Sequence, residues 1–205
     1  MSQLTIETFI QLPEQIARLQ QWIFENIQPY IKGRVLEVQS GVGDFSSVLV
    51  ENNIPIHLSD TENINRDALE RKLNDSGMIR AIHNIDLQKP DFQLEYSPML
   101  GVFSTILAVN VNDRHFADRA IIQNAHSLLR QRGHLIMTTP SSTVLYPGTP
   151  EDLENVQLQN RARLKLLFQD FQILKTRYFN LKADVENASV FGFVGLSTLV
   201  ISRRN

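Results

Sequence analysis

Residues 33–45 constrain the fold of this 205-residue chain more than any other stretch. They read Gly-Arg-Val-Leu-Glu-Val-Gln-Ser-Gly-Val-Gly-Asp-Phe. Residues 35–38 are mostly apolar and β-branched, which predicts a short strand, and a helical pattern begins at Phe45. Glycines at 41 and 43 permit positive φ angles and let a ligand approach the main chain closely. The free N–H groups of the helix then point at that ligand, so the stretch predicts a nucleotide-sized binding site.

Two classes of cofactor use a turn of this kind. A dinucleotide fingerprint would read Gly41-x-Gly43-x-x-Ser46, with serine in place of the third glycine. An S-adenosylmethionine turn has an acid inside the strand, and would read Glu37-x-Gln39-x-Gly41-x-Gly43, with glutamine in place of the first glycine. A carboxylate in a buried strand needs a partner, which the loop amides or the ammonium of the cofactor would supply. We therefore favour S-adenosylmethionine as the cofactor.

In this stretch the chain resembles the class I, Rossmann-like S-adenosylmethionine-dependent methyltransferases, and GRVLEVQSGVGDFSSVLVE is similar to their first motif. The resemblance implies an α/β fold with a doubly wound, seven-stranded, mostly parallel sheet in the order 3-2-1-4-5-7-6 and helices on both faces. It extends from about Leu19 to the C-terminus and is clearest over residues 33–60 and 102–139. Two closing strands, residues 171–178 and 196–202, fit the reversed hairpin that ends such a sheet and that dinucleotide-binding domains lack.

Length and composition fit one domain. A chain of 205 residues with 42% hydrophobic content can form a single α/β domain. The resemblance implies that residues 1–32 form a helical cap and residues 33–205 the Rossmann-like core. The net charge is −2 and the charges are dispersed, so no nucleic-acid surface is expected. The absence of cysteine excludes disulfides and zinc–thiolate sites. Neither a signal peptide nor a membrane span is indicated, so we expect a cytoplasmic protein.

Apolar periodicity predicts alternating helices and strands. The segment 90–98, with Phe92, Leu94 and Tyr96 alternating, is interpreted as a short edge segment, and Pro140 is expected to stop the fifth strand. Helices are expected at 13–28, 45–53, 63–76, 116–130 and 152–168. Strands are expected at 35–38, 54–58, 78–85, 102–109, 134–139, 171–178 and 196–202.

Four residues outside the turn are candidates for cofactor binding. Asp60 ends the second strand, the position from which a carboxylate takes both hydroxyls of a ribose, although it could instead cap the next helix. The resemblance implies that Asp86 and Leu87 bracket the adenine, with Asp86 accepting a hydrogen bond from the exocyclic amine. Asp86 could equally be an exposed turn residue. Asn110 follows the fourth strand at the carboxyl edge of the sheet, where ligands of open α/β sheets bind.

Methyl transfer requires a general base only when the acceptor atom is protonated. The candidates are His115, whose ordinary pKa suits base work at neutral pH, and Asp113. His115 could instead be a partly buried histidine at a helix start, and Asp113 an N-cap. Arg114 could clamp an anionic substrate. The other histidines lack metal-ligand spacing, so no metal site is expected.

The sequence thus predicts S-adenosylmethionine-dependent methyl transfer to a small-molecule acceptor, by a monomer or homodimer without nucleic-acid or membrane partners. The alternative is a catalytically inactive, methyltransferase-like binding or partner subunit. Three departures from the family keep that alternative open. Gln39 replaces a glycine, "NVNDRHF" replaces the frequent "NVLEHI", and "LLRQRGHL" replaces "LLKPGGRL". Gln39 could point away or donate its amide to the cofactor carboxylate, or it could block the methionine part of the site.

Overall fold

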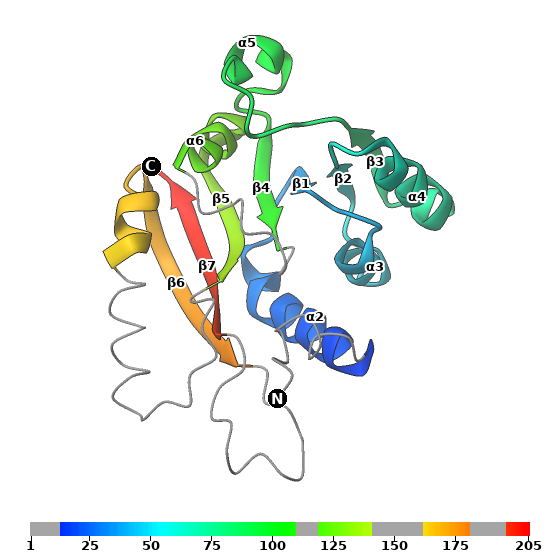
Figure 1. Ribbon diagram of the computed structural model, residues 1–205. Coiled ribbons are helices and arrows are strands. Elements are labelled where there is room, and N and C mark those ends of the chain that lie inside the picture. Colours follow the sequence, from blue (N-terminus) through cyan, green and yellow to red (C-terminus); the bar gives the residue numbers. More distant parts are fainter. Residues whose placement is uncertain (1–12, 110–118, 141–161, 181–195) are drawn as a thin grey trace, which may run out of the picture.

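The computed structural model describes residues 13–109, 119–140, 162–180 and 196–205, which form a seven-stranded sheet (Figure 1). The strand order β3-β2-β1-β4-β5-β7-β6 confirms the predicted topology. The first five strands are parallel, and β7 is antiparallel to both of its neighbours, which confirms the reversed hairpin. The strands are β1 (Val35–Val38), β2 (Ile56–Ser59), β3 (Ile79–His83), β4 (Phe103–Ala108), β5 (Leu129–Pro140), β6 (Phe171–Asn180) and β7 (Leu196–Arg204).

Helices cover both faces of the sheet. One apolar core cluster joins the strands to α2, α3 and α4, and the other joins them to α5, α6 and the helical residues 162–167. The helices are α2 (Pro13–Ile27), α3 (Asp44–Glu51), α4 (Asn63–Leu73), α5 (Phe92–Glu95) and α6 (Arg119–Leu128), with 3-10 turns η1 (Gln28–Tyr30), η2 (Asn74–Ser76) and η3 (Ser97–Met99). None of the helices in the described part of the chain is long and apolar enough to cross a membrane.

The central strands are buried on both faces, which explains their unbroken apolar sequences. Neighbouring residues of β4, Ile106 and Leu107, belong to opposite core clusters, and each is completely buried. Val35 and Leu36 of β1 divide between the clusters in the same way. A strand buried on both faces reads as a continuous apolar run and not as an alternation. This arrangement brings the end of β1 and the turn after it to the middle of the sheet.

The expected edge segment at 90–98 is wrong, because this segment forms α5 and η3. Phe92 and Tyr96 lie one helical turn apart, and both are buried with their ring centroids 4.6 Å apart. Leu94 faces away and is 80% exposed. Three apolar residues at alternate positions fit a strand, but i and i+4 burial also fits one turn of helix. Figure 1 shows α5 beside the end of the sheet at which β4 begins.

The boundary between the fifth helix and the fifth strand also differs from the prediction. The helix ends at Leu128 and β5 already starts at Leu129. The predicted turn at residues 131–133 persists as an irregularity inside the strand, because Phe103 pairs with Leu129 whereas Thr105 pairs with His134. Pro140 does not stop the strand before itself, since it still pairs with Ser197 of β7.

Candidate functional site

The turn after β1 takes a left-handed backbone conformation at three alternate residues. The φ angles of Gln39, Gly41 and Gly43 are 53°, 56° and 82°. Glycine adopts this conformation freely, whereas a residue with a Cβ atom pays about 1–2 kcal/mol. The chain therefore keeps the backbone shape of a turn with three glycines, although a glutamine occupies the first of the three positions.

Backbone and serine hydrogen bonds hold this turn against the end of β2. The Ser40 N–H donates to the Ser59 carbonyl at 2.9 Å, and the Ser59 N–H donates to Ser40 Oγ at 3.3 Å. Gly43 has a packing role, because a Cβ atom there would lie 2.8 Å from Leu69 Cδ2 and 3.2 Å from Leu73 Cδ1. Both leucines belong to α4, so Gly43 allows α4 to pack closely against the start of α3.

Asp60 connects the turn to the start of α4. Its side chain is only 5% exposed, and its Oδ2 accepts a hydrogen bond from the Gly41 N–H at 2.8 Å. Its Oδ1 accepts from the Glu62 N–H and from Asn65 Nδ2, both at 3.0 Å. A carboxylate offers about four acceptor positions. One is therefore left for a ligand hydroxyl, and a second hydroxyl would have to displace the Asn65 amide.

The position of Asp60 is compatible with a ribose contact, which stays a prediction. The carboxylate lies against the glycine turn, where the ribose prediction places it. It also accepts from the N–H of Glu62, one residue before α4, which is an Asx turn and not the helix cap of the alternative, because α4 has no side-chain cap. Asn65 had no role in the predictions, because only the winding of α4 brings its side chain back to Asp60.

Glu37 is buried, and its hydrogen-bond partner is the hydroxyl of Ser46. Its side chain is 3% exposed, and Ser46 Oγ donates to Oε2 at 2.5 Å. Burial raises the pKa of Glu37 to about 7, and the bond from Ser46 opposes that rise. The loop amides or a cofactor ammonium were expected as partners, whereas Ser46 entered the predictions only as the third position of a dinucleotide fingerprint. A buried serine on the first turn of α3 is thus part of the site.

Gln39 carries an unsatisfied polar atom beside these residues. Its side-chain oxygen is buried, and within the described part of the chain it has no hydrogen-bond partner. A buried acceptor without a donor costs about 1–3 kcal/mol. Strained backbone and unsatisfied polar atoms both concentrate at functional sites. Gln39 combines the two, which makes it a candidate for ligand contact.

Comparison with known proteins gives matches only among solved structures. No family model and no curated protein matches the chain. A methyltransferase from Methanosarcina mazei aligns over 87% of this chain and 96% of its own, with a TM-score of 0.60 and 12% identity. The N-methyltransferase NodS from Bradyrhizobium japonicum aligns over 94% and 97%, with a TM-score of 0.62 and 12% identity. The chain has the fold of the class I S-adenosylmethionine-dependent methyltransferases.

The methyltransferase fold alone does not determine the reaction. The [4+2]-cyclase SpnF also matches, over 91% of this chain and 80% of its own, with a TM-score of 0.57 and 14% identity. Functions are carried by sites and not by folds. The reaction of this chain has to be argued from the residues around the turn.

The two residues expected at the adenine lie after β3. Asp86 Oδ1 accepts from the Gln88 N–H at 2.8 Å, and the Asp86 N–H donates to the Tyr96 hydroxyl at 3.0 Å, so Asp86 forms a turn. Leu87 is 6% exposed and packs in the core with Phe92. The adenine contacts of Asp86 and Leu87 stay predictions. Asn110, Asp113, Arg114 and His115 lie outside the described residues, and their roles also stay predictions.

Two histidines form a hydrogen-bonded pair on the face of β2 and β3. His57 Nδ1 and His83 Nε2 are 3.0 Å apart, with ring centroids 5.3 Å apart and planes at 12°. The centroids are about as far apart as two ring radii added to the N–N distance, so the two rings lie edge to edge and nearly coplanar. One of the two facing nitrogens therefore donates a proton and the other accepts it. Burial lowers the pKa of His57 to about 4, with His83 and Arg34 adding to the effect. The described residues contain no group of three metal-ligating side chains.

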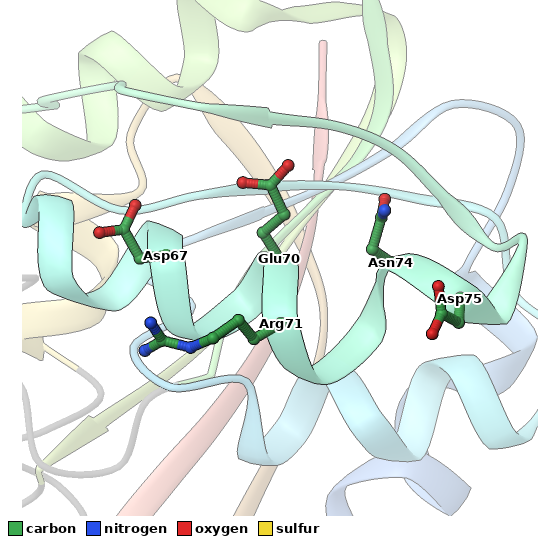
Figure 2. A pocket seen from close by; sticks show the side chains of 5 residues that line it. All are labelled: Asp67, Glu70, Arg71, Asn74 and Asp75. Atoms are coloured by element: carbon green, nitrogen blue, oxygen red, sulfur yellow. The ribbon is translucent and has the colours of Figure 1, made fainter.

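A polar hollow lies away from the turn, on the outer side of α4 and η2 (Figure 2). It is lined by the exposed residues Asp67, Glu70, Arg71, Asn74 and Asp75. These side chains lie opposite Leu69 and Leu73, which pack into the core. The hollow is shallow and open, so it would not withdraw a ligand from water. The turn after β1 is therefore the better candidate for the functional site.

Proposed function

We propose that this chain binds S-adenosylmethionine at the turn after β1 and transfers its methyl group to a small-molecule acceptor. The observation that carries the proposal is the junction of the left-handed turn with the Asp60 carboxylate through the Gly41 N–H. This junction lies at the carboxyl ends of β1 and β2, beside the point where the strand order reverses between β1 and β4. Ligands of open α/β sheets bind at such a point.

The residues present fit this cofactor in chemical terms. The cofactor has ribose hydroxyls and an ammonium group, both of which are hydrogen-bond donors. Asp60 retains a free acceptor position for a hydroxyl, and the Gln39 oxygen is a buried acceptor without a donor. Glu37 has a pKa of about 7, so an ammonium nearby would favour its ionised form. The site thus offers acceptors for the hydrogen-bond donors of the cofactor.

The protein's task in this reaction is alignment. The bound cofactor supplies a methyl group already activated by its sulfonium, so the chain has to orient it and exclude water. Asp60 would hold the nucleoside end, and Gln39 with the turn would hold the amino-acid end. A general base is needed only for a protonated acceptor, and Asp113 and His115 are the candidates we propose for it. We also propose a cytoplasmic monomer or homodimer without nucleic-acid or membrane partners.

Calorimetric titration with S-adenosylhomocysteine and, separately, with NAD tests the proposal. We expect heat with the homocysteine compound and none with NAD. Asp60→Ala should weaken binding by roughly 1.5–3 kcal/mol for each charged hydrogen bond lost. Because Asp60 also supports α4, thermal unfolding must show that the variant is folded. Asn65→Ala is the matched comparison, since it leaves the carboxylate and frees the acceptor position that the Asn65 amide occupies, so affinity should be retained or increase.

A second candidate function is that of an inactive partner subunit. The observation that favours it is the glutamine side chain at a glycine position of the turn. If Gln39 blocks the site, the wild type gives no heat with S-adenosylhomocysteine. That result, or heat with NAD instead, would reject methyl transfer.

A further inference from the structure

We propose that Gln39 recognises the amino-acid end of the ligand, its side-chain oxygen accepting a hydrogen bond from the ligand's ammonium group. The site would then select adenosyl compounds that carry a protonated amine over those that lack one. The inference rests on the proposed function, because it concerns the same site. It goes further by naming the residue and the ligand group that decide selectivity.

First, no contact within the described part of the protein accounts for the backbone conformation and the buried side-chain oxygen of Gln39. Its backbone is left-handed, a conformation that residues other than glycine, asparagine and aspartate rarely adopt. Its side-chain oxygen is buried, yet no described residue donates a hydrogen bond to it. Protein interiors satisfy nearly all buried polar atoms, and the exceptions call for a missing partner. A ligand that supplies a donor is such a partner.

The second argument concerns the kind of ligand group. The unsatisfied atom of Gln39 is an acceptor, so it would repel a ligand carboxylate and attract an N–H group. Two residues earlier, Glu37 adds a buried carboxyl group that accepts a hydrogen bond from Ser46. An ammonium group has three donors and a positive charge, and it suits an acceptor-rich region of this kind.

The third argument is the position of Gln39 along the site. Asp60 lies against Gly41, and we assign the ribose to it; Gln39 lies on the other side of Ser40, where β1 ends. A ligand that follows the turn from Asp60 toward β1 therefore reaches Gln39 with the group attached beyond its ribose. In adenosyl compounds of this class that group is the amino acid.

The experiment compares two ligands that differ only in this group. S-adenosylhomocysteine carries the amino acid, whereas 5′-deoxy-5′-methylthioadenosine ends at the sulfur. We expect the wild type to bind the first at least tenfold more tightly in calorimetry. Gln39→Met keeps the length of the side chain and removes the amide, so it should reduce that preference by about tenfold, which corresponds to about 1.4 kcal/mol. Its affinity for methylthioadenosine should change by less than twofold.

Two further variants complete the test. Gln39→Gly removes the acceptor but also the backbone strain, so its affinity for S-adenosylhomocysteine should fall by less than about tenfold. Gln131→Met, at an exposed glutamine near the start of β5, is the matched control and should change neither affinity. The inference would be overturned if the wild type bound the two ligands equally tightly, or if Gln39→Met kept the wild-type preference. Either result would leave the proposed function in place. No heat with either ligand would remove the proposed function as well.

Discussion

The pair of Glu37 and Ser46 shows how one strand residue and one helix residue adjust each other. Glu37 lies in β1, is buried, and needs a donor within reach. Ser46 supplies it from the first turn of α3, where it is itself completely buried. Burial makes this acid costly to ionise, and hydrogen bonds from the neutral hydroxyls of Ser46 and Ser40 offset only part of that cost, so its pKa rises to about 7. The carboxyl group can therefore change its charge near neutral pH.

We predict that Glu37→Gln stabilises the protein at alkaline pH. The native pKa of about 7 lies above the ordinary 4.5, so between these values the native state binds more protons than the unfolded state. The stability that this carboxyl group contributes is therefore present below pH 4.5 and is lost as the pH rises through 7. Glutamine can still accept the Ser46 hydrogen bond without being ionised. Urea unfolding at pH 8 should show a gain on the order of 2–3 kcal/mol.

At pH 5 the same variant should gain much less, because the wild-type carboxyl group is then already protonated in the native state. Glu70→Gln, at an exposed position on α4, is the control and should change stability little at either pH. A gain of equal size at pH 5 and pH 8 would show that the charge of Glu37 is not its cause.

At the scale of residues, the sequence predicted which residues the candidate site brings together but not the hydrogen bonds between them. The glycine spacing places Gln39, Gly41 and Gly43 in one turn, and the end of a neighbouring parallel strand has to bring Asp60 close to them. The partners Ser46 and Asn65 could not be predicted, because they depend on which side of a helix faces the strand ends and on side-chain rotamers. Neither is a matter of sequence spacing.

Among the elements, α4 determines how tightly the turn is held. Leu69 and Leu73 pack against Gly43, and Lys72 of the same helix forms a 3.0 Å ion pair with Asp44 at the start of α3. The ion pair is exposed and contributes little. The leucines are buried, so apolar packing fixes the distance between the two helices. A glycine at position 43 is required by this packing, whether or not a ligand binds.

We predict that Gly43→Ala destabilises the protein more than Gly77→Ala does. Both glycines have a left-handed φ, 82° and 69°, so both variants lose about 1–2 kcal/mol from the backbone. A Cβ atom at Gly77 meets nothing within 4 Å, whereas at Gly43 it lies 2.8 Å from Leu69. Overpacking of this kind adds about 1–3 kcal/mol. Urea unfolding of the two variants measures the difference, and equal losses would show that α4 moves away without cost.

The wrong predictions at α5 and at the start of β5 share a physical cause. At α5, Phe92 and Tyr96 are buried because they pack into the core cluster that also contains residues of β4. Three apolar residues at alternate positions do not reveal this packing. At the start of β5, residues 130–133 could form a turn or an irregular strand, and pairing with β4 decides for the strand. Long elements with a complete apolar pattern were predictable because the pattern itself specifies their burial. Short ones take their structure from neighbours that are distant in the sequence.

At the scale of the whole molecule, the pKa values of all four described histidines lie below the ordinary value. Burial is the main cause that lowers the pKa of His57, His83, His126 and His134. Arginine side chains add to the effect at His57, His126 and His134, because they repel a second positive charge. In the unfolded chain these histidines would titrate near the ordinary value of 6.5. Acid should therefore act on this fold mainly through its histidines.

We predict that the free energy of unfolding falls as the pH decreases from 7 to 5. Below pH 6.5 the unfolded chain takes up protons at these histidines, whereas the native state does not until a lower pH, about 4 for His57. Their contribution to stability is thus complete above pH 6.5 and is lost toward the native pKa values. Over the same range Glu37 takes up a proton in the native state, which raises the free energy of unfolding and offsets part of the loss caused by the histidines. Urea unfolding at pH 7, 6 and 5 measures the net slope.

Two variants separate these effects. Glu37→Gln removes the opposing carboxyl group, so its stability should fall more steeply from pH 7 to pH 5 than that of the wild type. His57→Gln removes one buried histidine and retains a polar group that can reach His83, so its stability should fall less steeply. If both rings took up a proton in the native state, the N–H groups of His57 Nδ1 and His83 Nε2 would face each other, so this pair resists full protonation. Stability of the Glu37→Gln variant that is constant or rises from pH 7 to pH 5 would show that these histidines take up protons in the native state.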